Sequence, residues 1–122
     1  MKELLAIRYA EGGRWVDGLP PEDQVLDCLG LVLRYFEAVL GVSLPDPAEA
    51  TCRDEMVRTA FGRRFYPVSV PQVHDIAELP INHVGVVVPG GILHVDGTGE
   101  LSHIMPMRRC RAKGFHRLRG IE

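Results

Sequence analysis

The chain has 122 residues, 46% of them hydrophobic, and a formal net charge of -2 at pH 7. This composition is ordinary for a globular protein, and the length predicts a single domain spanning residues 1–122. The charge balance does not favour a nucleic-acid partner, and no apolar run is long enough to favour a membrane span. Three widely spaced cysteines do not form the pattern of a disulfide framework.

The N-terminal stretch contains an acidic residue, Glu3, and lacks a long apolar core, so no signal peptide is predicted. A short helix is predicted from Glu3 to Ala10. A loop rich in glycine and proline follows and carries Trp15. Trp15 is interpreted first as a core residue, although its loop position also allows it to line a cleft.

The clearest helical pattern begins after this loop. Asp27 suits the N-cap position, and Gly41 and Pro45 are stop signals beyond the last periodic residue. One face of the predicted helix is apolar, because hydrophobic residues recur at three- and four-residue steps. These residues are Leu29, Val32, Phe36, Val39 and Leu40.

Cys28 falls in the first turn of this helix. The unpaired N–H groups and the helix dipole favour an anion there, and a thiolate is an anion. Gly30 has no side chain and would let another element come close. Two interpretations stay open for Cys28 at this point: a reactive thiol, or a small buried hydrophobe.

The rest of the chain predicts a second short helix and then strands. The helix is expected from about Ala48 to Ala60, since Cys52, Met56 and Ala60 share a face. After Phe61, short β-rich runs separated by proline and glycine predict an antiparallel meander, which gives an α+β fold. The basic residues between positions 108 and 119 are interpreted as a solvated strand edge or tail, or secondarily as a site for an anionic partner.

A hairpin is predicted around Pro89 and Gly90. If these are the central turn residues, Gly85 faces His94 and His83 faces Asp96. Side chains alternate along strands, so these four residues share one face, and the two histidines are diagonal neighbours. The opposite face then carries the core residues Val84, Val86, Val88, Leu93 and Val95.

Cysteine nucleophiles need a base, and the base needs a third group that fixes its tautomer and orientation. Two histidines on one strand face supply such groups, although they are also compatible with two exposed polar residues. A zinc site of His103, Cys110 and His116 has no supporting ligand spacing. Cys52 and Cys110 are expected to be buried thiols, and His74 is expected at the surface or at a strand edge.

The stretches LDCLGLVLRYFEAVLGVSLPD and HVGVVVPGGILHVDG together resemble the NlpC family of cell-wall cysteine peptidases, which have a papain-like fold with helices packed on an antiparallel sheet. The resemblance implies that Cys28 is the nucleophile, His83 the base and His94 the orienting residue. It also implies a substrate site around Trp15, Asp27, Gly85 and Asp96. His74 stands where the family has a glycine. The stretches LGVSLPD and GFHRLRG are similar to phage-tail-associated members.

The resemblance implies hydrolysis of peptidoglycan stem peptides near a γ-D-glutamyl bond to a diamino acid, without a metal or organic cofactor. It implies other phage tail proteins as partners, and a location in the virion tail or the producing cell's cytoplasm, with action at the cell wall. One alternative is a weakly catalytic or non-catalytic structural component of the tail tip. Another is an amidase or acyltransferase acting on a substrate outside the wall.

Overall fold

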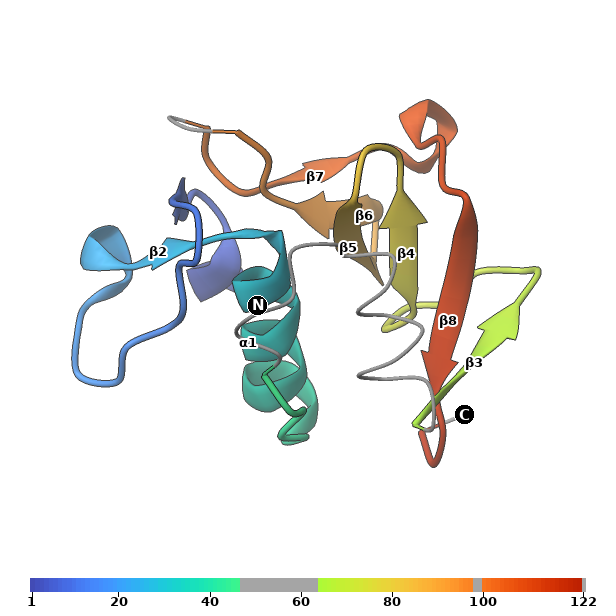
Figure 1. Cartoon of the computed structure of the whole chain (residues 1–122), viewed down its shortest axis with the longest axis horizontal. Coiled ribbons are helices and arrows are strands. Elements are labelled where there is room, and N and C mark those ends of the chain that lie inside the picture. The colour runs from blue at the N-terminus through green and yellow to red at the C-terminus, as the bar shows by residue number, and fades with distance from the viewer. Residues whose placement is uncertain (47–63, 98–99, 122) are drawn as a thin grey trace.

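One helix stands beside a six-stranded antiparallel sheet in the computed structural model, which describes residues 1–46, 64–97 and 100–121 (Figure 1). The helix α1 spans Cys28–Leu40, and the strand order is β3-β8-β4-β5-β6-β7. The strand bounds are Phe65–Val68 (β3), Ile76–Leu79 (β4), His83–Val88 (β5), Gly91–His94 (β6), His103–Met105 (β7) and Gly114–Leu118 (β8). The predicted α+β class is therefore confirmed, whereas the helix predicted over 48–60 lies outside the described residues.

The remaining described elements are short. Strands β1 (Arg8–Tyr9) and β2 (Val25–Leu26) pair in parallel, and in Figure 1 they lie on the side of α1 away from β3 and β8. Three 3₁₀ turns span Lys2–Leu4, Pro21–Asp23 and Met107–Arg109. The described helices include none with the length and apolar character needed to cross a bilayer.

Helix α1 begins and ends where the sequence predicts. The Asp27 side chain caps it by accepting a hydrogen bond from the Gly30 N–H, and Gly41 ends it with a φ of 66°, in the left-handed region. Leu29, Val32 and Phe36 are buried, as the periodicity requires. Their burial against β5 fixes the rotation of the helix and therefore the direction in which its first turn points.

The prediction of a helix from Glu3 to Ala10 is wrong. Ala6 has a φ of 60°, which interrupts any helix, and the chain continues into β1. The competing interaction is tertiary: Ser102 accepts a hydrogen bond from the Ile7 N–H through its hydroxyl, which donates to the Leu4 carbonyl. A helix this short has little stability of its own, so pairing with the segment before β7 prevails.

The expectation of a strand edge or tail at the basic C-terminal segment is wrong for β8. Most of the basic side chains are exposed, as expected of a solvated segment: Arg108, Arg109, Arg111, Lys113 and Arg119. Strand β8 lies inside the sheet, hydrogen-bonded to β3 on one side and to β4 on the other. Arg117 donates from Nε and Nη2 to the two carboxylate oxygens of the buried Asp75, each at 2.9 Å. Part of the basic character therefore serves to pair a buried carboxylate.

The hairpin of β5 and β6 has the predicted register. Val88 pairs with Gly91 and Val86 with Leu93, around a turn at Pro89 and Gly90. The face predicted to be apolar packs with α1 in one buried cluster, which includes Val84, Val86, Val88, Leu93 and Val95. A second cluster covers the other face with Ala77, Leu79, Val87 and Ile92, so the central strands are buried on both sides.

His74 is half-buried rather than placed at an open surface. Its Nδ1 lies 2.7 Å from the Tyr35 hydroxyl, and burial raises the pKa of Tyr35 to about 12. Tyr35 therefore keeps its proton at ordinary pH, and its hydroxyl is hydrogen-bonded to the His74 ring. The φ of His74 is 84°, a value that a glycine adopts without strain, which explains why glycine suits this position.

Gly30 brings α1 into contact with the loop before β2. A Cβ atom at Gly30 would lie 2.2 Å from the Gly13 carbonyl oxygen, far inside van der Waals contact. Gly13 is also crowded, since its Cβ would lie 2.7 Å from the Val25 carbonyl oxygen. The absence of side chains at both positions therefore lets the loop lie directly against the first turn of the helix.

We predict that Gly30→Ala lowers the free energy of unfolding by about 1 to 3 kcal/mol, because the new methyl group forces backbone to move. The gain in helix propensity from alanine, about 1 kcal/mol, is already included in this range. Urea denaturation measures the change. Gly114→Ala is the control, since its nearest neighbouring atom would be 4.0 Å away. Equal stability of the two variants would contradict the close approach.

Candidate active site

The start of α1 and the start of β5 border one cavity of about 220 Å³. Cys28 comes from the first turn of the helix and His83 from the first position of the strand. Both are nearly buried, with exposed fractions of 5% and 9%. The other lining residues are Tyr9, Glu11, Ile81, Asn82 and Asp96. A thiol and an imidazole therefore face a space that opens to solvent.

His83 is hydrogen-bonded to His94 on the neighbouring strand. The distance from His83 Nε2 to His94 Nδ1 is 2.9 Å, and both side chains are buried. This contact agrees with the predicted shared face of β5 and β6. It also assigns the ring atoms: because Nε2 of His83 faces His94, Nδ1 is the ring nitrogen left to act on another group.

Gly85 makes room for this pair. A Cβ atom there would lie 2.8 Å from the Leu93 carbonyl oxygen and 3.2 Å from Cβ of His94. Any side chain at Gly85 would push β6 and His94 outward. Gly85 is thus placed as a spacer within the sheet, although the sequence suggested it for the substrate site.

His94 stays neutral at ordinary pH. Burial lowers its pKa to about 4, helped by repulsion from His83 and His103, while Asp96 acts in the opposite direction. A neutral His94 has one ring nitrogen with a lone pair, which can accept a hydrogen bond from His83. His94 therefore can hold a protonated His83 without adding a second positive charge.

His103 extends the pair to a third histidine. It lies opposite His94 in the pairing of β6 with β7, and the two Nε2 atoms are 3.2 Å apart. The sequence suggested His103 only as a zinc ligand, and no strand was predicted at the position of β7. Alternation on a strand predicted at residues 103–105 would have revealed its place beside His94.

The three side chains considered for zinc are engaged elsewhere. His103 contacts His94, His116 is hydrogen-bonded to Glu78, and the Cys110 sulfur accepts from the Ala112 N–H at 3.2 Å. Within residues 1–46, 64–97 and 100–121, no three or more His, Cys, Asp or Glu side chains are grouped for a metal ion. The zinc interpretation therefore has no geometric support.

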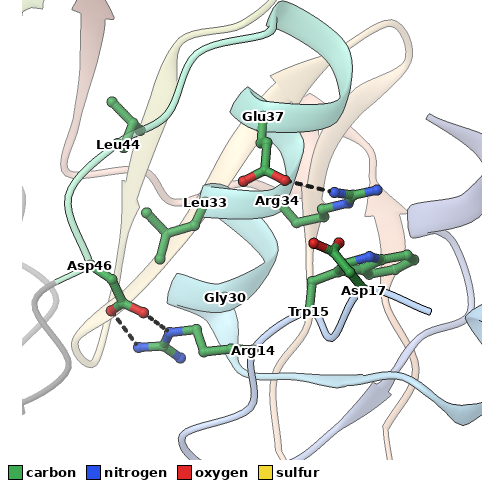
Figure 2. A pocket seen from close by; sticks show the side chains of 9 residues that line it. All are labelled: Arg14, Trp15, Asp17, Gly30, Leu33, Arg34, Glu37, Leu44 and Asp46. Atoms are coloured by element: carbon green, nitrogen blue, oxygen red, sulfur yellow. Dashed lines mark hydrogen bonds and ion pairs between the residues drawn. The ribbon is translucent and has the colours of Figure 1, made fainter. Parts of the chain in front are cut away.

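Trp15 lines a different cavity, of about 210 Å³, on another side of α1 (Figure 2). The Arg34 guanidinium lies over the Trp15 ring, 4.3 Å from its centroid, and also pairs with Glu37 at 2.9 Å. Cation–π contact of this kind fixes the indole against the helix. Trp15 is therefore separated from the cavity that holds Cys28 and His83.

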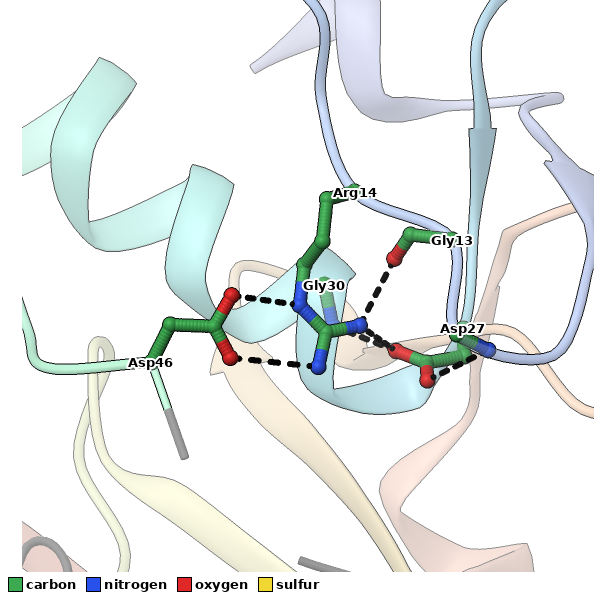
Figure 3. Close-up of polar contacts among 6 residues, drawn as sticks. Gly13, Arg14, Asp27, Gly30 and Asp46 are labelled. Carbon is green, nitrogen blue, oxygen red and sulfur yellow. Dashed lines mark hydrogen bonds and ion pairs between the residues drawn. The ribbon is translucent and has the colours of Figure 1, made fainter. Parts of the chain in front are cut away.

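The two aspartates suggested for substrate binding have different surroundings. Asp27 is 1% exposed, and its carboxylate accepts from the N–H groups of Gly12 and Gly30 and from Arg14 (Figure 3). These contacts give Asp27 a structural role at the helix start. Asp96 is exposed and lines the cavity, where its carboxylate can meet a ligand.

Ile81 and Asn82 form the rim next to His83, and the β-branched Ile81 is strained there. Their φ values are 63° and 53°, in the left-handed region, and Ile81 is 93% exposed. An exposed isoleucine in this conformation gains nothing from burial, and such strain tends to gather at functional sites. Neither the positive φ nor the exposure is visible in the sequence. Both residues line the cavity.

The lowered pKa of His94 makes stability depend on pH. The unfolded state binds a proton near pH 6.5 and the folded state only near pH 4. The stabilisation is therefore complete above pH 6.5 and is lost as pH falls toward 4. We expect wild type to lose about 1 to 3 kcal/mol more than His94→Gln over this interval, measured by urea denaturation. Parallel pH curves for the two proteins would contradict the assignment.

Comparison with known proteins establishes the fold. No protein-family model matches the sequence, and no curated protein matches it. The structure is similar to the crystal structure of the NlpC/p60 domain of the peptidoglycan hydrolase SagA, with a TM-score of 0.62 and 17% sequence identity. The similarity covers 96% of this chain and 92% of the SagA domain chain. The chain therefore has the NlpC/p60 fold, as the sequence motifs predicted.

Proposed function

We propose that this protein is a cysteine peptidase that hydrolyses peptidoglycan stem peptides. The observation that carries the proposal is the cavity shared by Cys28 and His83, with His94 hydrogen-bonded to the far nitrogen of His83. A thiol, an imidazole and an orienting group are the three parts that thiol-dependent acyl transfer needs. The similarity to a peptidoglycan hydrolase domain supports the wall as the place of action.

In the proposed reaction, Cys28 transfers its thiol proton to Nδ1 of His83, and the sulfur attacks the scissile carbonyl carbon. The protonated His83 then gives this proton to the leaving amine as the carbon–nitrogen bond breaks. Water hydrolyses the resulting thioester, which releases the carboxylate and restores the thiol. His94 accepts a hydrogen bond from Nε2 of His83 throughout, so that Nδ1 keeps facing the cavity.

The start of α1 supports two of these steps. The positive end of the helix dipole favours the Cys28 thiolate over the thiol, and it also favours the oxyanion that forms on the carbonyl. Backbone N–H groups at the helix start, including that of Cys28, are proposed to hold this oxyanion. Asp27 keeps the first turn in place through its hydrogen bond with Gly30.

The proposed bond lies between a γ-D-glutamyl residue and a diamino acid. The sequence motifs support this choice, and so do two exposed carboxylates, Glu11 and Asp96, that line the cavity. A diamino acid carries an amino group, which these carboxylates attract. Ile81 offers an apolar contact at the same rim.

The proposed setting is a phage or prophage tail, with other tail proteins as partners and with action at the cell wall. Two sequence stretches, LGVSLPD and GFHRLRG, support this setting through their resemblance to tail-associated members of the family. A protein in which the same fold serves only assembly is the alternative that the experiments below distinguish.

We predict that iodoacetamide alkylates Cys28 about tenfold faster than Cys110 near neutral pH, because a thiolate reacts and a thiol does not. Brief labelling followed by mass mapping identifies the modified residue. Cys110 is the internal control, since it is half-buried and follows the end of a 3₁₀ turn instead of standing in the first turn of an α-helix. Labelling of Cys28 at or below the rate of Cys110 would count against a nucleophile at this position.

We predict that Cys28→Ala lowers the release of peptides from purified peptidoglycan by about a thousandfold or more, since the nucleophile is lost. The melting temperature should stay within about 5 °C, because this truncation removes little packing. His83→Ala should be nearly as severe, and His94→Ala should retain more activity. Mass analysis of the released peptides identifies the cleaved bond.

Two outcomes separate catalysis from assembly. Wild type that releases no wall peptide, even with tail proteins present, would reject the peptidase. If Cys28→Ala folds but no longer assembles into particles, the structural alternative gains support. Normal assembly with a defect only at infection would support the catalytic proposal.

A further inference from the structure

A row of hydrogen-bonded histidines crosses three neighbouring strands and ends on a backbone carbonyl. His83 Nε2 is 2.9 Å from His94 Nδ1, and His94 Nε2 is 3.2 Å from His103 Nε2. Nδ1 of His103 lies 3.0 Å from the Leu101 carbonyl oxygen. The row therefore runs from the cavity, through the buried pair, to an exposed side chain on β7.

The terminal carbonyl determines which nitrogen of each ring carries a proton. A carbonyl oxygen only accepts, so Nδ1 of His103 must be the donor, and in the neutral ring Nε2 then has the lone pair. His94 must donate from Nε2 to that lone pair, which leaves its own Nδ1 as an acceptor. His83 must then donate from Nε2, and its lone pair is on Nδ1.

The opposite arrangement would disable the base. If His103 carried its proton on Nε2, His94 would have to donate from Nδ1, and His83 would have to accept at Nε2. The single proton of neutral His83 would then be on Nδ1, where no lone pair would remain to take the proton of Cys28. That arrangement would also place the lone pair of His103 Nδ1 against the Leu101 oxygen, which is repulsive.

We propose that the Leu101 carbonyl, acting through His103 and His94, sets the tautomer of His83, and that His103 is a positioning residue of the active site. This inference rests on the proposed function for its catalytic consequence. It adds to the histidine pair a third ring and a backbone acceptor that the reaction itself does not touch. The same direction of donation also suits the step in which His83 is protonated, since the charged ring still donates from Nε2 to His94.

The backbone around Leu101 is held in place. Arg8 and Leu101 form an isolated antiparallel bridge, and the Ser102 N–H donates to the Ile7 carbonyl at 2.8 Å. The Ser102 hydroxyl is buried and bonded to both Leu4 and Ile7. The carbonyl that orients the row is therefore anchored by the N-terminal segment, so that its direction does not depend on the exposed His103 side chain.

Nitrogen-15 NMR of the imidazole rings tests the assignment without any substrate. Cys28→Ala is the background, because no thiol can then share its proton with His83. Near neutral pH we expect His83 and His94 to carry the proton on Nε2 and His103 to carry it on Nδ1. A proton on Nδ1 of His83 or on Nε2 of His103 would overturn the proposal.

The rate of Cys28 alkylation tests whether the tautomer of His83 affects the reactivity of the thiol. His103→Leu removes the acceptor, and we expect about tenfold slower labelling, the effect of one lost hydrogen bond to a charged network. His103→Gln should restore most of this rate, because its side-chain oxygen can accept from His94. Equal rates in wild type and His103→Leu, or equal loss in both variants with unchanged melting temperatures, would overturn the proposal.

A double variant and steady-state kinetics test whether His103 acts on His83 through His94. In a His94→Ala background, His103→Leu should change nothing further, because His103 acts through His94. On a wall peptide, His103→Leu should lower kcat about tenfold and leave KM unchanged, since substrate does not touch His103. If wild type cleaves no wall peptide, the proposed function fails, while labelling and NMR still decide the tautomers.

Discussion

The buried carboxylate of Asp27 fixes the first turn of α1, in which Cys28 lies. It accepts at 2.7 Å from the Gly30 N–H, at 3.1 Å from the Gly12 N–H and at 2.8 Å from Arg14, which also holds Asp46 (Figure 3). A buried charge is tolerated only when it is paired and hydrogen-bonded, and losing one partner costs about 3 to 5 kcal/mol. The same carboxylate therefore joins the loop before the helix to its first turn. The thiol that follows directly in the chain is placed by this network.

The second half of the site is built by the sheet. His83, His94 and His103 come from three adjacent strands, where antiparallel pairing fixes the relative positions of the rings. Gly85 permits this arrangement, because any side chain there would separate β5 from β6. Burial of the central strands on both faces holds His83 and His94 in place, and hydrogen bonds to His94 and to the Leu101 carbonyl hold His103. Such a row can transmit a tautomer preference, because each ring is hydrogen-bonded to the next one.

The rim of the cavity between these halves combines a turn with positive φ values and two carboxylates. Ile81, which is strained, and Asn82 lie beside His83, while Glu11 and Asp96 add negative charge. Trp15, which a loop position suggested for this cleft, packs under Arg34 at a separate cavity instead (Figure 2). The proposed substrate contacts therefore lie at the β4–β5 turn and at two carboxylates, whereas the indole packs beside α1.

The sequence by itself determined the helix from Cys28 to Leu40, the hairpin register and the pairing of His83 with His94, because periodicity, caps and turns act locally. Tertiary structure decided the rest. The segment from Glu3 to Ala10 ends in the short strand β1 instead of forming a helix, because Ser102, distant in sequence, binds its backbone. The end of the basic stretch became the inner strand β8 for the same kind of reason. His103 gained its place only when β7 paired with β6. Contacts between segments far apart in the chain leave no local pattern, so only the folded structure could show which residues they bring together.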